Sequence, residues 1–305
     1  SRRVLISGSV AYDNLLVFEG RFKDHILPDH LHRLSVSFVT PTLKREFGGC
    51  AGNIAYSLYQ LGSTPLVMAT VGADGASYVD RMKRWGIPLD LVKTVDDSYT
   101  AQAIIITDSD NNQITAFHPG AMGEAHSQPV PARSDIQLAI IAPDGRDAMV
   151  EHAAQLAHAK IPFVFDPGQG LPMFNGEELL RFVDQATWVA VNDYEGKMLA
   201  DRTGLSLAQI SQRPNIRGLI ETLGADGCRV WVNGQSEHVA GLKADAVIDP
   251  TGCGDAFRGG LLHGLSQGWA LTQCVALGNQ MGAAKIACAG PQNYTVNAST
   301  VIART

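Results

Sequence analysis

The sequence lacks the marks of several common protein classes. No apolar run approaches the about 20 residues of a membrane-spanning helix, and the opening Ser1-Arg-Arg-Val-Leu-Ile6 is typical of the approach to a strand rather than of a signal peptide. Lys and Arg number 24 against 30 Asp and Glu, a net charge of −6 that disfavours a broad nucleic-acid or membrane surface. The five cysteines form no CxxC pair and no metal-ligand spacing. We therefore expect a cytoplasmic protein with reduced thiols that binds neither nucleic acid nor membrane.

Several catalytic motifs are also missing. The chain has no Gly-x4-Gly-Lys-Ser/Thr phosphate loop, no dinucleotide-type Gly-x-Gly-x-x-Gly after its first strand, and no His-Glu-x-x-His. Gly264-Leu-Ser-Gln-Gly268 has the letters of a hydrolase nucleophile elbow. It stands at the end of an expected helix instead of between a strand and a helix, so we treat the match as chance.

What the chain does contain is an alternation of short apolar runs and helix-like stretches over 305 residues, 45% of them hydrophobic. Such alternation predicts an α/β fold with a mainly parallel central sheet flanked by helices. The expected strands are Val4–Ser9, Pro65–Val71, Leu138–Ala142, Pro162–Asp166, Trp188–Asn192 and Leu219–Leu223. The expected helices are Gly52–Leu61, Ser77–Trp85, Ala148–Ala159, Gly176–Ala186, Tyr194–Arg202 and one that begins after Gly254.

Two regions break this pattern. Residues from about 13 to 47 alternate polar and apolar side chains without a convincing helix, and residues 98–120 contain a hairpin whose strands are Ala103–Thr107 and Gln113–Phe117. We expect a small second sheet there, which either covers a substrate as a lid or only extends the structure. A further edge hairpin is expected over Cys228–Asn233 and Glu237–Val239. The whole chain, 1–305, is predicted to be one domain.

The segment Asp249-Pro-Thr-Gly-Cys-Gly-Asp255 is the most informative in the chain. Its two glycines permit a tight turn and close approach to a ligand, and the helix that follows offers unpaired N–H groups to an anion. Asp255 lies at that point, where it suits the role of a base. The alternative is that Asp255 only caps the helix.

Together with polar clusters at other strand ends, these motifs resemble the ribokinase-like (PfkB) family of carbohydrate and nucleoside kinases. The resemblance runs from Gly8 to about Gly290. Gly48-Gly-x-Ala-x-Asn53 is similar to the first signature of the family, and Asp249-x-Thr-Gly-x-Gly-Asp255 to the second. Cys253 stands where many members have alanine, but its main-chain amide would still face phosphate.

The resemblance implies a role for each matching residue. Asp255 would deprotonate the attacking hydroxyl, and the amides of Gly252, Cys253 and Gly254 would stabilise the transferring phosphoryl group. The residues implied at the sugar are Asp13 and Asn53, which would bind ribose hydroxyls, and Gly48 and Gly49, which would let the backbone approach. Asn53 has the alternative of a capping or packing role in its helix.

The resemblance also implies ATP and Mg²⁺ as cofactors. Asn192 and Glu195 would organise magnesium through water, although Glu195 has the alternative of a solvated helix residue. Thr222 and Gly224 would lie by the nucleotide phosphates, and Asn279 near its adenine or ribose. Asp249 and Thr251 match positions that in many members help to hold a monovalent cation such as K⁺.

The acceptor is expected to be a nucleoside, phosphorylated at its 5′-hydroxyl, with adenosine first and inosine or guanosine as further substrates. Tyr12 places an aromatic ring beside Asp13, and Phe117 suits stacking on a purine. The stretch Gln113–Met122 resembles the lid and following loop of prokaryotic adenosine or nucleoside kinases of this family. Phe117 is equally suited to the core of its hairpin. The rival functions are a ribokinase or other sugar kinase and a nucleoside-binding sensor without turnover; the chain is expected to be a monomer or homodimer.

Overall fold

The computed structural model describes residues 2–305 and contains two sheets. The larger has nine strands in the order β13-β12-β11-β10-β9-β8-β1-β4-β5, and all neighbours are parallel except in the pairs β11–β12 and β12–β13. Its strands are β1 (Arg3–Ser7), β4 (Pro65–Gly72), β5 (Val92–Val95), β8 (Ile136–Ile141), β9 (Phe163–Phe165), β10 (Trp188–Asn192), β11 (Gly218–Thr222), β12 (Cys228–Val232) and β13 (Gln235–Val239). The predicted mainly parallel α/β architecture is confirmed.

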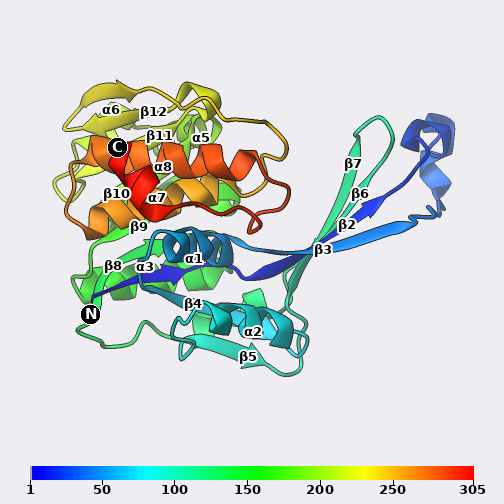
Figure 1. Cartoon of the computed structure of the whole chain (residues 1–305), viewed down its shortest axis with the longest axis horizontal. Helices are drawn as coiled ribbons and strands as arrows, with labels where there is room; N and C mark the ends of the chain where they lie inside the picture. Colours follow the sequence, from blue (N-terminus) through cyan, green and yellow to red (C-terminus); the bar gives the residue numbers. More distant parts are fainter. Residues whose placement is uncertain (1) are drawn as a thin grey trace.

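Helices cover both faces of this sheet (Figure 1). On β1, Val4 and Ile6 pack toward one helical layer and Leu5 toward the other, because successive strand residues point to opposite faces. The first layer contains α1 (Cys50–Gln60), α2 (Ala76–Arg84), α7 (Cys253–Ser266) and α8 (Leu271–Ile286), with α9 (Ala298–Ala303) against α8. The second contains α3 (Arg146–His158), α4 (Gly176–Gln185), α5 (Asp193–Thr203) and α6 (Leu207–Ser211). The inner strands β4, β8 and β9 are therefore almost entirely buried and apolar, whereas the edge strands β5 and β13 are partly or fully exposed and carry polar residues.

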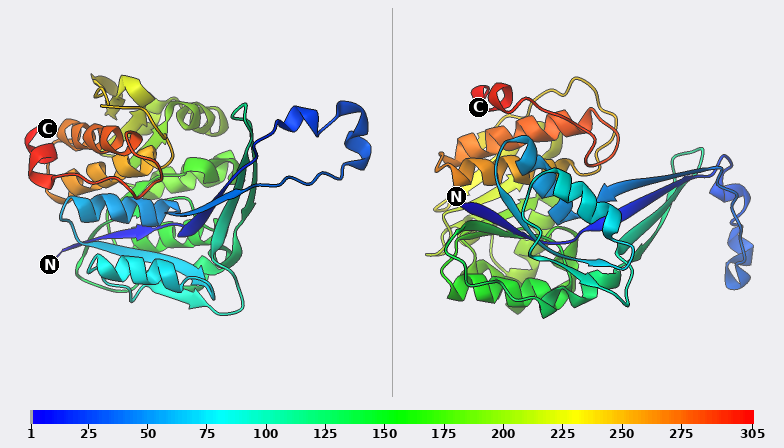
Figure 2. Two further views of the ribbon diagram at one scale, coloured as in Figure 1. Left: turned by 45° about the vertical axis from the view of Figure 1, so that its right-hand side comes forward. Right: turned by 60° about the horizontal axis from the view of Figure 1, so that its bottom comes forward.

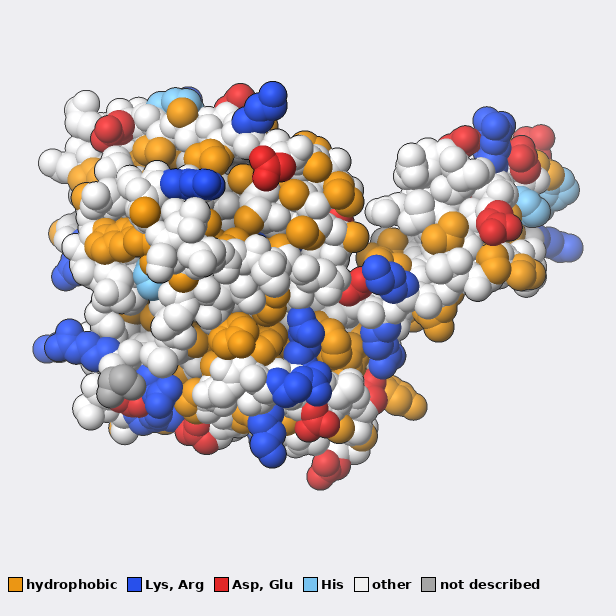
Figure 3. Space-filling view, in the orientation of Figure 1, with side chains coloured by type: hydrophobic (Ala, Val, Ile, Leu, Met, Phe, Trp, Pro, Cys, Tyr) orange, Lys and Arg blue, Asp and Glu red, His pale blue; other side chains and the backbone are white. Residues whose placement is uncertain are grey.

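The second sheet has four strands in the order β3-β2-β6-β7 and stands out from the main body (Figures 1 and 2). Its strands are β2 (Ala11–Val17), β3 (Thr42–Gly48), β6 (Ala101–Thr107) and β7 (Gln113–His118). The small sheet expected from the two irregular regions is therefore present. The space-filling view shows it, with the 18–41 segment, as a lobe on a narrow waist (Figure 3).

The segment between β2 and β3 contains only two short 3₁₀ turns, η1 (Phe22–Asp24) and η2 (Pro28–Arg33), in agreement with the prediction of no convincing helix. It forms a small aromatic cluster of its own, in which the ring of Phe38 lies 4.8 Å from that of Phe18 and 5.2 Å from that of Phe22. This cluster gives the far end of the lobe a local core.

Element boundaries differ from the predictions by one or two residues, as they do where caps decide the ends. The first strand ends at Ser7 and not at Ser9, because Ser9 serves helix α1: its hydroxyl accepts from the Cys50 amide at 3.0 Å and its carbonyl from the Ala51 amide at 2.8 Å. Helix α1 therefore begins at Cys50, two residues before the predicted start. Gly49, with φ of 85°, makes the sharp entry possible.

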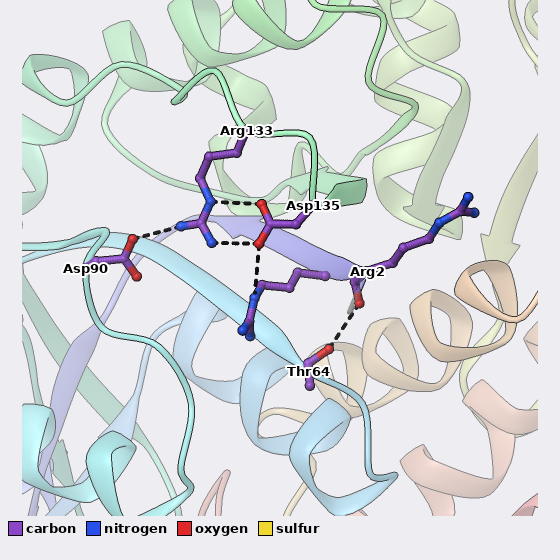
Figure 4. Close-up of polar contacts among 6 residues, drawn as sticks. Arg2, Thr64, Asp90, Arg133 and Asp135 are labelled. Carbon is purple, nitrogen blue, oxygen red and sulfur yellow. Dashed lines mark hydrogen bonds and ion pairs between the residues drawn. The ribbon is translucent and has the colours of Figure 1, made fainter.

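An ion network joins the amino ends of the large-sheet strands (Figure 4). The guanidinium of Arg133 forms a forked pair with Asp135 at 2.9 and 2.7 Å and reaches Asp90 at 2.7 Å, while Arg3 bonds Asp135 at 3.2 Å. The hydrogen bonds from Arg133 lower the pKa of Asp135 to about 2. This network stabilises the edge of the sheet opposite to the carboxyl ends of its strands.

Across residues 2–305, none of the helices combines the length and the apolar character that crossing a bilayer demands.

Candidate active site

A cavity of about 1010 Å³ opens at the carboxyl ends of β9, β10 and β11, beside α7 and α8. This is where ligands gather in parallel α/β sheets. The predicted phosphate, magnesium and nucleotide residues all line it: Asn192, Glu195, Thr222, Gly224, Gly252, Cys253, Gly254, Asp255 and Asn279. The structure therefore brings together residues that lie up to 87 positions apart in the sequence, from Asn192 to Asn279.

The turn before α7 depends on glycine. Gly252 has φ of 80°, in the left-handed region, and a Cβ atom there would lie 2.9 Å from the Pro291 side chain. The Cys253 amide donates to the Pro250 carbonyl at 3.1 Å, so one of the three predicted anion-binding amides is already engaged in the turn. The start of α7 faces the cavity with Gly254 and Asp255 in its first turn.

Asp255 accepts a hydrogen bond from Asn53, which lies 202 positions earlier in the chain. The Asn53 side-chain nitrogen Nδ2 donates to Asp255 Oδ2 at 2.9 Å. The orientation of the Asn53 amide is fixed from behind, because its Oδ1 accepts from Gln292 Nε2 at 3.0 Å, and Gln292 also donates to the Tyr78 hydroxyl at 2.8 Å. Asn53 is thus buried and aimed at Asp255, on the helix that the first signature opens.

Burial raises the pKa of Asp255 to about 7. The hydrogen bond from Asn53 opposes this shift, the charge of nearby Asp166 adds to it, and Arg258 opposes it. A carboxyl group that titrates near neutral pH is well matched to the work of a general base.

A buried ion pair lies beside Asp255. Arg258 Nε contacts Asp166 Oδ2 at 3.1 Å, and the two residues are 5% and 3% exposed. Burial raises the pKa of Asp166, and the adjacent guanidinium opposes that rise. Both residues line the cavity, so a positive charge stands one helical turn after Asp255.

Asn192 and Glu195 form a reciprocal cap on helix α5. The Asn192 side chain accepts from the Glu195 amide at 2.6 Å, and Glu195 Oε1 accepts from the Asn192 amide at 3.0 Å. Burial raises the pKa of Glu195. The cap holds both side chains at the cavity, so Glu195 is not the fully solvated helix residue of the alternative interpretation.

Thr222 and Gly224 lie at the end of β11, and Asn279 lies across the cavity on α8. Asn279 Nδ2 donates to the Ala240 carbonyl at 3.2 Å and so holds the loop after β13. That loop was not predicted to contribute, yet it lines the cavity with Gly241, Leu242, Lys243, Ala244 and Val247. Within residues 2–305, no group of three or more His, Cys, Asp or Glu side chains is close enough to hold a metal ion by itself.

Asp13 and the two glycines of the first signature lie outside this cavity, on its small-sheet side. Asp13 faces Glu46 across β2 and β3, and a Cβ atom on Gly48 would lie 2.7 Å from Asp13 Oδ2. Burial, followed by the charges of Glu46 and Asp249, raises the pKa of Asp13 to about 6. Asp13 is thus a second carboxyl group with a raised pKa, next to Gly48 and within the field of Asp249, while Gly252 approaches Asn53.

Phe117 belongs to the same row of the small sheet as Asp13. The strand register pairs Asp13 with Ala103 and Ala103 with Phe117, so all three side chains project from one face. Phe117 is 52% exposed and therefore is not a hairpin core residue. Two strand spacings, about 10 Å, separate Asp13 from Phe117, with only the small Ala103 between them.

Asp249 and Thr251 also lie outside the cavity lining. Both oxygens of the Asp249 carboxylate accept main-chain amides, from Thr251 at 2.9 Å and from Gly290 at 2.8 Å. These bonds outweigh burial and hold the pKa of Asp249 below its usual value. The carboxylate thereby closes the turn onto the loop that follows α8.

A family model described as pfkB family carbohydrate kinase matches residues 15–298. The chain belongs to the pfkB family. As a pfkB kinase it is a phosphotransferase, and its fold matches the solved structure of Methanocaldococcus jannaschii nucleoside kinase, with a TM-score of 0.90 at 25% identity over 100% of this chain and 98% of that one.

Nucleoside kinases are among the relatives of this pfkB protein. The nucleoside kinase of Methanocaldococcus jannaschii is 28% identical over 246 residues, 80% of each chain. The solved structure of Burkholderia thailandensis nucleoside kinase in complex with inosine is 49% identical, with a TM-score of 0.88, and the match covers 99% of this chain and 96% of that one. The ADP-inosine complex of the same enzyme matches at 50% identity with a TM-score of 0.85, over 99% of this chain and 94% of that one.

Sequence reasoning missed Asp166, Arg258, Gln292 and Lys243 in this pfkB site. Two of them had a usable signal: Asp166 ends a predicted strand, and Arg258 follows Asp255 by three residues on one helix face. Gln292 and Lys243 lie in irregular segments, where only the folded chain brings them to the site.

Proposed function

We propose that this kinase transfers the γ-phosphoryl group of ATP to the 5′-hydroxyl of a purine nucleoside, with adenosine first and inosine and guanosine as further acceptors. The observation that carries the proposal is the 2.9 Å hydrogen bond between Asn53 and Asp255. It joins Asn53 of the first signature to the carboxyl group of Asp255 on the cavity wall, so that an alcohol held by Asn53 would lie against Asp255.

In this proposal Asp255 accepts the proton of the 5′-hydroxyl as the oxygen attacks phosphorus. Its pKa of about 7 gives it a large ionised fraction at neutral pH. The amides of Gly252 and Gly254, with that of Cys253 shared with Pro250, stabilise the charge on the transferring group together with the dipole of α7. Positioning and charge stabilisation supply most of the acceleration in phosphoryl transfer.

The residues of the cavity fit ATP and magnesium. Magnesium keeps several water ligands and prefers oxygen donors, and Asp166 and Glu195 present carboxylates at the cavity wall. Glu195 keeps one oxygen for the cap of α5 and has the other for a magnesium-bound water. Thr222 and Gly224 would bind the phosphates of ATP, and Asn279, Leu242 and Val247 would surround its adenine ring.

The row of Asp13, Ala103 and Phe117 supports a nucleoside over a free sugar. Asp13 and Asn53 would bind the ribose hydroxyls, with Gly48 and Gly49 keeping the backbone close, and the purine base would lie over the small side chain of Ala103. The exposed ring of Phe117, in the same row, would then stack on the purine base. The small sheet acts in this proposal as a lid, and residues 1–305 act as one domain.

A sugar kinase is the second candidate, because fructokinases are also similar; that of Escherichia coli is 26% identical over 236 residues. A silent nucleoside sensor is the third. One experiment separates all three. The protein is incubated with ATP and Mg²⁺ and a panel of nucleosides and free sugars, and ADP release is measured. We expect turnover with adenosine, inosine and guanosine; turnover with sugars alone contradicts the nucleoside assignment, and none with any acceptor contradicts the kinase.

A further inference from the structure

A fully buried ammonium group lies behind the anion-binding turn. Lys285, near the end of α8, is 0% exposed. Its Nζ atom donates to the main-chain carbonyl of Asp249 at 2.7 Å and to that of Cys288 at 2.8 Å. Lysine is almost never fully buried without a reason, so this charge calls for an explanation.

The partners of Lys285 are neutral carbonyls and not a carboxylate. In the described part of the chain no acidic group lies within 4.0 Å of its ammonium, and the nearest candidate, Asp249, spends both carboxylate oxygens on the amides of Thr251 and Gly290. Burial raises the pKa of the Asp249 carboxyl group, but the amide hydrogen bonds and the charge of Lys285 hold it low. Lys285 forms no direct ion pair with Asp249, so its charge is only partly compensated. The electric field of the Lys285 ammonium therefore also attracts any negative group that binds at the Asp249–Asp255 loop.

That loop is the one that ends in Asp255. Asp249 begins it, and Gly252, Cys253 and Gly254 lie within it. The charge also acts on Cys253: burial raises the pKa of its thiol and Lys285 opposes that rise, while the carboxylates of Asp249 and Asp255 add to it. Lys285 thus adds a fixed positive charge to the side of the turn away from the cavity.

The same contacts bear on the monovalent cation expected at Asp249 and Thr251. A potassium ion would need several oxygen ligands at this turn. The carboxylate oxygens of Asp249 are taken by amides, and its carbonyl oxygen, with that of Cys288, is taken by Lys285. The residues present therefore do not fit a bound monovalent cation, whose charge the ammonium would repel.

We infer that Lys285 is a built-in cation that takes the place of a monovalent metal ion and holds the anion-binding turn in its active geometry. It is a positioning residue, since it touches the Asp249–Asp255 loop from behind and not the substrate. The tethered charge makes the enzyme independent of potassium. This inference rests on the proposed phosphoryl transfer.

The first test uses the wild-type protein. Turnover of adenosine with MgATP is compared in K⁺, Na⁺ and tetramethylammonium salts at equal ionic strength, because ionic strength alone alters exposed charges. We expect equal kcat and equal thermal midpoints in all three. Activation by K⁺ overturns the inference but leaves the proposed function standing, whereas absence of turnover in every salt contradicts the function itself.

The second test removes the charge. In Lys285→Ala we expect kcat to fall about 100-fold, with recovery when NH₄⁺ or K⁺ is added but not with the larger tetramethylammonium. Lys197→Ala is the matched control, because Lys197 has a side chain 80% exposed on α5; its kcat should not change in any salt. A Lys285→Ala protein that keeps wild-type kcat, or loses it without rescue by small cations, overturns the inference.

Discussion

The turn before α7 and the outer strand β7 are both assigned to the proposed site, but they are held in different ways. The turn is fixed by Gly252 in the left-handed region, by Lys285 from behind and by Asn53 from the side. Every residue of β7 is exposed, and the strand is held by its antiparallel backbone pairing with β6. A rigid turn suits a reaction whose geometry never changes, while an exposed strand suits recognition of acceptors that differ in shape.

Substitutions in these two regions should have different kinetic effects. Changes at the turn should lower kcat for every acceptor by the same factor, whereas changes on the small sheet should alter KM and the order of preferred acceptors.

Asp255→Asn should lower kcat by about 10²–10⁴-fold, because it removes the base while keeping the shape and the bond from Asn53. The factor should be the same for adenosine, inosine and guanosine, and calorimetry should show nucleoside binding near the wild-type level. If kcat fell by different factors for different acceptors, the proposed difference between the turn and the small sheet would be wrong. Near-normal turnover would mean that Asp255 only caps helix α7.

Gly252→Ala should lower kcat by about 10²-fold, because a side chain at φ of 80° costs about 1–2 kcal/mol and would press on Pro291 beside the anion-binding amides. The matched control is Gly204→Ala at the end of α5, where φ is 72° and nothing lies within 4 Å of the added Cβ atom. Both variants should melt earlier, but only the first should lose turnover. Equal kinetic losses would mean that the turn contributes stability alone.

The pH profile should separate the two carboxyl groups. Asp255 must be ionised to accept a proton, so kcat/KM should fall about tenfold for each pH unit below its pKa of about 7 and level off above it. Asp13, with a pKa of about 6, should add a rise in the KM for nucleoside below that pH. A profile that is flat from pH 5 to 8 would contradict the assignment of the base.

Phe117→Ala should raise the KM for purine nucleosides about fivefold, since loss of one stacking contact costs about 1 kcal/mol, and should leave kcat unchanged. Activity with ribose, if measurable, should not respond. Ile114→Ala is the control, because Ile114 is similarly exposed on β7 but lies three residues away on the opposite face. Equal responses of the two variants would remove Phe117 from acceptor recognition.

The sequence predicted the local parts of this molecule well. Strand β10 has the predicted bounds, Trp188–Asn192, because its buried residues form one uninterrupted apolar run between polar flanks. The spacing of Asn192 and Glu195 also contains its own structural explanation, the capping box. These features depend on neighbours within a few positions.

Features that depend on distant partners were not predictable in this way. Arg258 and Asp166 are 92 positions apart, and nothing in the pattern around either shows that they pair. Lys285 is an ordinary helix residue in the sequence, and only its contacts with Asp249 and Cys288 reveal its burial. The edge strand β5, with four partly or fully exposed residues, gives no apolar signal.

Ser9 connects the two sheets, and its position has a mechanical consequence. It lies between β1 and β2, and its hydroxyl and carbonyl hold the first amides of α1, the helix that aims Asn53 at Asp255. A rotation of the small sheet about Ser9 would therefore strain the first turn of α1. In this way, binding of the acceptor would change the position of Asn53 relative to Asp255. Slower hydrogen exchange of the Cys50 and Ala51 amides on adding nucleoside would report this coupling, and unchanged exchange would show that the lobe and the base move independently.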